Sequence, residues 1–224
     1  MKAIKTFAIT LLASLSLSSP LIAGSADFAG IWGGVTASVN GAAIDGTHTD
    51  RGGDVAANKL TTKGKVGAVV PTAGLEAGFN LPLGDVFFIT VGGTYIKGKV
   101  NIARGENAAG DADITIAGEN SETIFIAPSV SFFDNSAMYI KYGSTDIGLV
   151  TKGAVDAEAN FDLSGTLYGV GMITQFNSGI YVKTEASAAQ FDNFLITGVA
   201  GSSTAVVEGD PLIASGTVSI GYKF

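Results

Sequence analysis

Four charged residues that lie within otherwise apolar or small-residue segments are the first candidates for chemistry in this sequence. They are Glu76, Lys141, Lys183 and Glu185. Two carboxylates and two ammonium groups can neutralise one another. Charges that are buried away from water need such pairing, because an isolated buried charge is costly. Such a cluster has two possible roles. It is either a satisfied polar plug, or a gate that opens a narrow ion path when the pairs exchange partners.

The sequence around these charges alternates between apolar and polar residues, which is the pattern of β-strands with one apolar face. Leu75 and Ala77 flank Glu76, for example, and all four charges lie on the polar face of their segments. The alternation recurs in eight segments, and we predict a strand at each. The predicted strands cover residues 31–40, 73–81, 87–95, 123–132, 138–143, 168–172, 180–187 and 214–224.

Short and long connections alternate between these strands. Turn-forming residues predict short turns at 82–85, 134–136 and 177–179. The other four connections are long, at about 44–65, 98–122, 144–162 and 190–211. An even number of strands with short turns on one side and long loops on the other is typical of outer-membrane barrels. We therefore predict an all-β fold: an eight-stranded, antiparallel, up-and-down transmembrane β-barrel.

The four charges lie at similar distances from the predicted short turns. Glu76 precedes the first turn by six residues, and Lys141 follows the second by five. Lys183 and Glu185 follow the third turn by four and six residues. Because all three turns lie at one end of the barrel, we predict a single lumen ion cluster. An eight-stranded barrel is only wide enough inside for side chains, which favours the plug over the gate.

The N-terminus has the pattern of a secretory signal. Lys2 and Lys5 precede an apolar stretch at 7–17, and small residues follow at 23–26. We predict a cleaved signal peptide over residues 1–25 and a barrel domain over 26–224. The remaining chain has no apolar stretch long enough for a membrane-spanning helix. A membrane location would therefore require a closed barrel, which satisfies every backbone hydrogen bond in lipid.

Aromatic residues gather near the ends of the predicted strands. Tyr95 lies eight residues beyond Phe87, and Tyr168 lies eight before Phe176. Eight tilted strand residues climb about 20 Å, close to the height of the apolar band of an outer-membrane barrel. We predict two aromatic girdles, built from Phe79, Phe87, Tyr95, Phe132, Tyr168, Phe176, Tyr222 and Phe224.

The last strand resembles the C-terminal assembly signal of outer-membrane proteins, which end in Phe after alternating apolar or aromatic residues. Here these are Val218, Ile220, Tyr222 and Phe224. The segment at 27–34 similarly looks like the first strand of small barrels of that class. The chain thus resembles the transmembrane domain of outer-membrane protein A and the opacity-type and porin-family small barrels.

The resemblance implies a location and a set of partners. The location is the outer membrane of a Gram-negative bacterium. The partners are outer-membrane lipid and lipopolysaccharide, together with the assembly machinery that reads the C-terminal strand, and we expect a monomer. An interior ion cluster is also a feature of the outer-membrane protein A barrel. The resemblance does not extend to a peptidoglycan-binding domain.

Several kinds of chemistry are disfavoured by composition. Cysteine is absent, which excludes thiolate metal sites and cysteine nucleophiles. A net charge of -7 disfavours binding to nucleic acid, which proteins bind through basic surfaces. His48 is the single histidine, in a predicted loop without a nucleophile motif beside it. We therefore expect no enzyme, no cofactor and no metal site, with an enzyme acting on lipid A as a remote alternative.

Three functions stay open on the sequence. The favoured one is an envelope-structural or surface-loop protein with a polar-plugged lumen. The others are a narrow channel for ions or small solutes, and a surface adhesin or host- or phage-contact protein. One rival fold also remains, a soluble lipid-binding barrel, because alternation alone does not say which face points inward.

Overall fold

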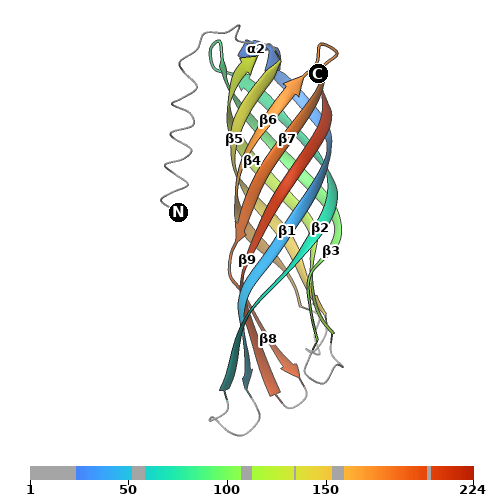
Figure 1. The fold of residues 1–224 in the computed structure, drawn as a ribbon, viewed down its shortest axis with the longest axis vertical. Coiled ribbons are helices and arrows are strands. Elements are labelled where there is room, and N and C mark those ends of the chain that lie inside the picture. The colour runs from blue at the N-terminus through green and yellow to red at the C-terminus, as the bar shows by residue number, and fades with distance from the viewer. Residues whose placement is uncertain (1–23, 52–58, 107–112, 134, 153–158, 201–202) are drawn as a thin grey trace.

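The described chain is almost entirely β-strand and forms one barrel (Figure 1). The computed structural model describes residues 24–51, 59–106, 113–133, 135–152, 159–200 and 203–224. The expected signal peptide lies outside these residues except for Gly24 and Ser25. No helix within the described part of the chain is long and apolar enough to cross a membrane.

Eight antiparallel strands close the barrel, which confirms the predicted fold class. Each pairs with the next along the chain, and β9 closes the sheet on β1. A further short strand, β8 (Phe194–Ala200), pairs with the outer part of β9. The eight barrel strands are β1 Gly30–Arg51, β2 Lys59–Pro82, β3 Phe87–Glu106, β4 Asp113–Phe133, β5 Ser136–Lys152, β6 Ala159–Gln175, β7 Ile180–Phe191 and β9 Ser203–Lys223.

The strands run much further than the alternation predicted, and most of each predicted long connection is strand. The β1–β2 hairpin, for instance, continues in register from the barrel to the pair Arg51–Lys59. These outer parts are rich in Gly, Thr and Asp and have no continuous apolar face for a pattern to reveal. Backbone pairing nevertheless continues, because a register fixed in the barrel extends along an antiparallel hairpin without further long-range loop closure.

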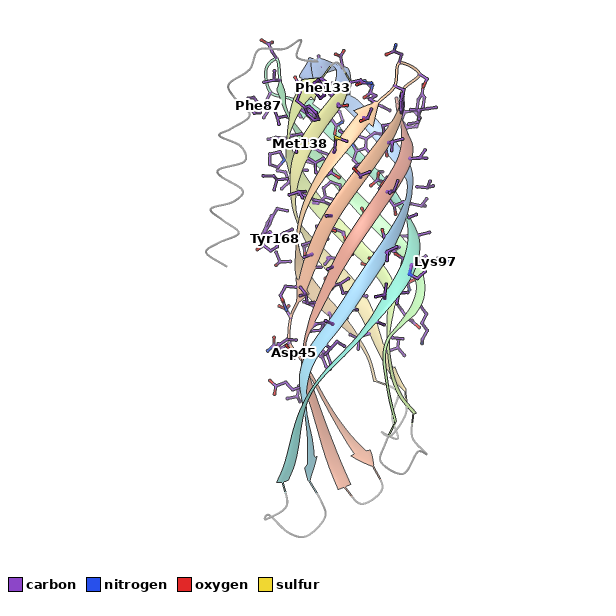
Figure 2. All side chains as sticks on the ribbon, viewed as in Figure 1. Asp45, Phe87, Lys97, Phe133, Met138 and Tyr168 are labelled. Atoms are coloured by element: carbon purple, nitrogen blue, oxygen red, sulfur yellow. The ribbon has the colours of Figure 1, made fainter. Side chains whose placement is uncertain are left out.

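The apolar faces of the strands point outward and the charges point inward. Leu75 and Ile220 are 60% and 55% exposed, whereas Glu76 and Lys183 are 5% and 7% exposed. Phe87 and Tyr168 project from the outer surface in Figure 2. The rival fold, a soluble barrel with its apolar face inside, is therefore wrong.

Two prolines lie inside strands although proline cannot donate to a β-ladder. Pro71 of β2 lies beyond Gly74, the last residue of β2 that pairs with β3. Pro128 of β4 lies between Ile126 and Ser129, which are its two nearest neighbours that pair with β5. Both prolines are thus placed where a strand has one partner rather than two.

A single helical turn, α2 (Ser25–Phe28), covers the barrel end that carries the short turns. The Phe28 ring stacks on Phe88 with centroids 5.1 Å apart, and both side chains are buried. Asn80 donates from Nδ2 to the Phe28 carbonyl at 2.8 Å, and the Ser25 N–H donates to the Asp85 carbonyl at 2.7 Å. The turn end of the lumen is therefore closed by the chain's own N-terminal segment.

Candidate functional site

The structure brings the four predicted lumen charges together as two ion pairs. Lys141 Nζ lies 3.0 Å and 3.2 Å from the two carboxylate oxygens of Glu185. Lys183 Nζ donates to Glu76 Oε2 in the second pair. The charged side chains are between 2% and 8% exposed, so each charge is compensated out of contact with bulk water. They come from β2, β5 and β7, whose polar faces meet across the lumen.

Each of the two carboxylates also accepts a hydrogen bond from a tyrosine. Tyr139 Oη donates to Glu185 Oε2 at 2.8 Å, and Tyr181 Oη donates to Glu76 Oε1 at 3.1 Å. Tyr139 and Lys141 are two apart on β5, so they share one face of the strand. Tyr181 and Lys183 repeat this spacing on β7. The cluster therefore contains two units of the same chemistry, each with one carboxylate, one ammonium group and one phenol.

An aromatic ring lies close to the ammonium group of each lysine. Lys141 Nζ lies 4.1 Å from the centre of the Phe125 ring, and Lys183 Nζ lies 5.1 Å from that of Trp32. Trp32 in turn meets Tyr181 edge to face, with centroids 5.8 Å apart. Cations over ring faces are stabilised most where they are desolvated, as here. The rings and the ion pairs form one continuous plug across the lumen.

Glycines make room for these rings inside the narrow barrel. A β-carbon added at Gly34 would lie 2.5 Å from Tyr181 Oη, and one at Gly92 would lie 2.8 Å from the Phe125 ring. A β-carbon at Gly171 would likewise overlap the phenol of Tyr139. The absence of a side chain at Gly171 therefore leaves room for the Tyr139 ring in the lumen.

The aromatic members of the plug are the residues that sequence reasoning missed. Tyr139 and Tyr181 lie on the polar face of their strands, which the alternation did reveal. The available signal was the repeated spacing of a tyrosine two residues before a lysine, in Tyr139-Ile-Lys141 and Tyr181-Val-Lys183. A phenol on the same strand face as an ammonium group can bond to the same carboxylate.

Below the plug, toward the turn end, the lumen is almost filled. The free space there is about 20 Å³, lined by Trp32, Asn80 and Phe88 among others. That volume holds about one water molecule. Asn80 Oδ1 accepts from Trp32 Nε1 at 3.0 Å and from Thr90 Oγ1 at 2.8 Å, so the amide ties the plug to the α2 cap.

The predicted girdle aromatics lie on the outer surface with one exception. Phe132 is half-buried, because a β-bulge between Ser131 and Phe133 shifts the alternation and turns Phe133 outward, 58% exposed. Tyr142, which the prediction omitted, packs against Tyr168 with centroids 5.3 Å apart. The exposed members are Phe79, Phe87, Tyr95, Tyr168, Phe176, Tyr222 and Phe224.

The predicted C-terminal signal lies along the outer face of β9 and ends one residue beyond it. Val218, Ile220, Tyr222 and Phe224 are all exposed. The Phe224 N–H donates to the Ile31 carbonyl at 2.9 Å, so the terminal residue takes part in the closure of the barrel on β1. The backbone of His48 lies in β1, beyond the barrel wall, and its side chain lies outside the described part of the structure.

The sequence matches no protein-family model and no curated protein sequence. Among solved structures it is similar to Ail, the attachment invasion locus protein of Yersinia pestis, with a TM-score of 0.38, 8% identity, and coverage of 83% of this chain and 98% of that one. It is also similar to Neisserial surface protein A, with a TM-score of 0.39 and 10% identity over 84% of this chain and 97% of that one. For the outer-membrane protease OmpT from Escherichia coli, the TM-score is 0.45 and the identity 7%, over 87% of this chain and 96% of that one. No functional conclusion follows from similarities at this level.

Proposed function

We propose that this protein is an integral barrel of the outer membrane of a Gram-negative bacterium, with a plugged lumen and an envelope-structural or surface-loop role. One observation carries the proposal. The closed barrel turns its large apolar side chains outward while its buried ionic groups face the axis. Where its strands are paired on both sides, a closed barrel leaves no unpaired sheet edge, so this part can lie in lipid at no cost in backbone hydrogen bonds. Water, by contrast, would meet a continuous apolar exterior.

Cell fractionation and heat modifiability test the membrane assignment. The protein should enter the outer-membrane fraction. Unboiled samples should migrate differently from boiled ones in detergent gels, because a folded barrel resists detergent until it is heated. A protein that stays in the soluble fraction and shows one mobility would disprove the assignment.

The plug argues for a barrel that conducts little or nothing. The ion pairs, their two tyrosines and the rings beside them occupy the lumen at one level, and almost no space lies beneath them. Planar-bilayer recordings should therefore show no regular single-channel steps for the wild type. Reproducible steps would support the narrow channel instead. No catalytic step is part of the proposed role, and His48→Ala should leave the envelope lipids unchanged.

The long hairpins favour a second role, contact with a host cell or phage. Beyond the barrel, strands β2, β1, β9 and β8 continue as one sheet that projects from the long-loop end (Figure 1). We propose that this end faces the exterior of the cell. An epitope inserted between Ala200 and Ser203 should bind antibody on intact cells, and one inserted between Asn177 and Gly179 should not. Binding only at the second site would reverse the orientation and remove this role.

A further inference from the structure

A cavity of about 140 Å³ lies in the lumen above the plug, toward the long-loop end. Its floor is the ion cluster, in which Glu76, Lys141, Lys183 and Glu185 all line the space. Hydroxyl and amide groups of several strands form its walls. Leu167, Phe191 and Ile213 are among the apolar residues that line it farther from the floor, where Glu119 and Asn120 also reach the space. The cavity thus combines a polar floor with apolar side chains on its walls.

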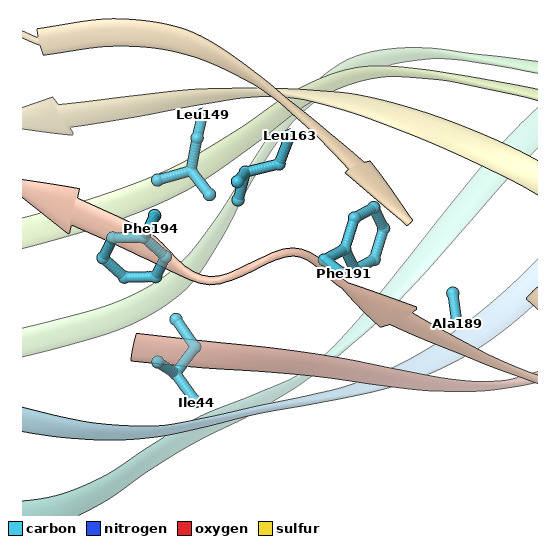
Figure 3. Close-up of a cluster of buried hydrophobic side chains, with 6 residues drawn as sticks. All are labelled: Ile44, Leu149, Leu163, Ala189, Phe191 and Phe194. Atoms are coloured by element: carbon cyan, nitrogen blue, oxygen red, sulfur yellow. The ribbon is translucent and has the colours of Figure 1, made fainter. Parts of the chain in front are cut away.

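An apolar cluster closes the cavity along the barrel axis. Ile44, Leu149, Leu163, Ala189, Phe191 and Phe194 pack together there and are each less than 7% exposed (Figure 3). Ile44 belongs to β1 and Leu149 to β5, which are opposite strands of the eight-stranded order. Side chains from opposite walls therefore meet across the lumen. Ala189 and Phe191 also line the cavity, so this cluster is its roof.

The side wall is interrupted between β2 and β3. Among the described residues, the last pair of these strands toward the long-loop end is Gly74 with Ile96. The cavity reaches past this pair, since Thr72 on β2 and Gly98 on β3 both line it. Gly98 has φ of 142°, and its N–H donates to Asn120 Oδ1 at 3.2 Å, where β3 and β4 bend away from β2 (Figure 1). We call this interruption the seam.

The polar end of the cavity contains a buried hydroxyl without a partner. Thr36 lines the cavity and is 4% exposed, yet its Oγ1 has no hydrogen bond within the protein. Ser219, directly opposite on β9, has the same deficit. A buried hydroxyl left unpaired is costly, so a group that reaches this position from outside would gain a hydrogen bond. Both neighbouring carboxylates are already paired, which favours a neutral group.

We propose that the cavity binds a small, elongated, neutral amphipathic molecule that enters through the seam. Its hydroxyl group bonds to Thr36, and its hydrocarbon part lies against Phe191 and Ile213. Ile213 and Ser219 are six residues apart on β9, which corresponds to about 20 Å of strand and about 15 Å along the axis. A medium-chain alcohol matches this length and polarity. The site goes beyond the proposed function, and its failure would leave the plugged barrel intact.

Methyl NMR in lipid nanodiscs provides the test, with 1-decanol as the probe. The δ1 methyl signals of Ile147 and Ile213 report on the cavity, and those of Ile31 and Ile220 report on the outer surface. Binding in the cavity should saturate the first two at a lower decanol concentration than the second two. Parallel titration of all four would mean simple partition into lipid, and it would overturn the proposal.

Two variants separate the hydroxyl contact from general packing. Thr36→Val should weaken decanol binding about fivefold, the loss expected for one hydrogen bond. The same variant should leave the binding of decane unchanged, because decane has no hydroxyl group to lose. Thr184→Val, on the exposed face of β7, is the matched control and should alter neither. If Thr36→Val weakened the binding of decanol and decane equally, Thr36 would not be the hydrogen-bond partner of the bound hydroxyl group.

Discussion

At the scale of single residues, this barrel depends on groups that are expensive to bury alone. Each lumen carboxylate has a lysine and a tyrosine as partners, and each lysine also lies over an aromatic ring. Replacing a whole buried ion pair by apolar groups is often nearly neutral, whereas removing one partner is not. The plug is therefore most sensitive to single substitutions that leave one charge behind.

Glu76→Gln should destabilise the barrel by about 3–5 kcal/mol, because it leaves the Lys183 ammonium buried without a counter-charge. The measurement is urea unfolding in lipid vesicles. Glu119→Gln is the control, since its ion pair with Lys99 at 2.8 Å is 41% and 36% exposed. That control should change the free energy of unfolding by less than about 1 kcal/mol. Similar losses for both variants would contradict a desolvated cluster.

Gly221→Ala should also destabilise the barrel, because the new β-carbon would overlap the phenol of Tyr181 and the Gly33 carbonyl. Overpacking of this kind costs about 1–3 kcal/mol. Gly216→Ala on the same strand adds a β-carbon with no atom within 4 Å, and it should be close to neutral. The measurement compares the urea midpoints of unfolding of the two variants, and that of Gly221→Ala should be the lower. A neutral Gly221→Ala would mean that the Tyr181 ring is not held in place.

At the scale of elements, the two ends of the lumen are closed by different means. The turn end is closed by α2, whose Phe28 packs on Phe88 and accepts from Asn80. The long-loop end is closed by the apolar roof, where Phe194, the first residue of β8, packs against side chains of β1, β5, β6 and β7. A short helix and a short strand thus close a cylinder that the long strands alone leave open.

Asn80→Asp should loosen α2. The new oxygen would face the Phe28 carbonyl in place of a donor and leave that carbonyl unpaired, at about 1–3 kcal/mol. Amide hydrogen exchange at Ala29, which donates to the Ala26 carbonyl at 3.1 Å, should become about tenfold faster or more. Asn177→Asp, in an exposed turn, should leave that rate unchanged. If amide exchange at Ala29 stays slow in Asn80→Asp, the stability of α2 does not depend on the Asn80 side chain.

The mature protein should keep Ser25. This residue is fully buried, and it donates through its N–H to Asp85 and through its hydroxyl to Gly84. Cleavage after residue 25, as the signal pattern predicts, would remove those contacts from the cap. The intact mass of the exported protein distinguishes the two outcomes. A chain that begins at Ala26 would show that the cap forms without Ser25.

At the scale of the whole molecule, the lumen is layered rather than continuous. From the turn end these layers are the α2 cap, the rings and ion pairs, the cavity and the apolar roof. Among the described residues, the seam between β2 and β3 gives the cavity a side without paired strands. This layering supports a plugged barrel with an internal site more than it supports an axial pore.

Phe224→Ala should lower the amount of assembled barrel in the outer membrane several-fold, if the C-terminal strand is what the assembly machinery reads. Phe176→Ala is the control, because Phe176 is also an exposed aromatic at the turn end but lies between β6 and β7, away from the C-terminal signal. The heat-shifted band in outer-membrane fractions measures the assembled barrel. An equal loss in both variants would assign the effect to lost aromatic contact with lipid.

The sequence by itself determined where the barrel strands lie, which side chains share one face of each strand, and the level of the ion cluster. The tripeptide Tyr-Ile-Lys occurs twice, at 95–97 and 139–141. The flanking alternation assigns the first tyrosine to the apolar face and the second to the polar face, and the structure turns the apolar face outward. Such assignments succeed because side-chain direction in a strand is a local property with a period of two residues.

Only the tertiary structure decided which lysine meets which glutamate, how far the strands continue, and where β2 and β3 separate. These features depend on register and on contacts between residues far apart in the chain, such as Glu76 and Lys183. The cap, the bulge at Phe132 and the roof have the same origin. In each, packing across the barrel selects one arrangement among several that the local pattern allows equally.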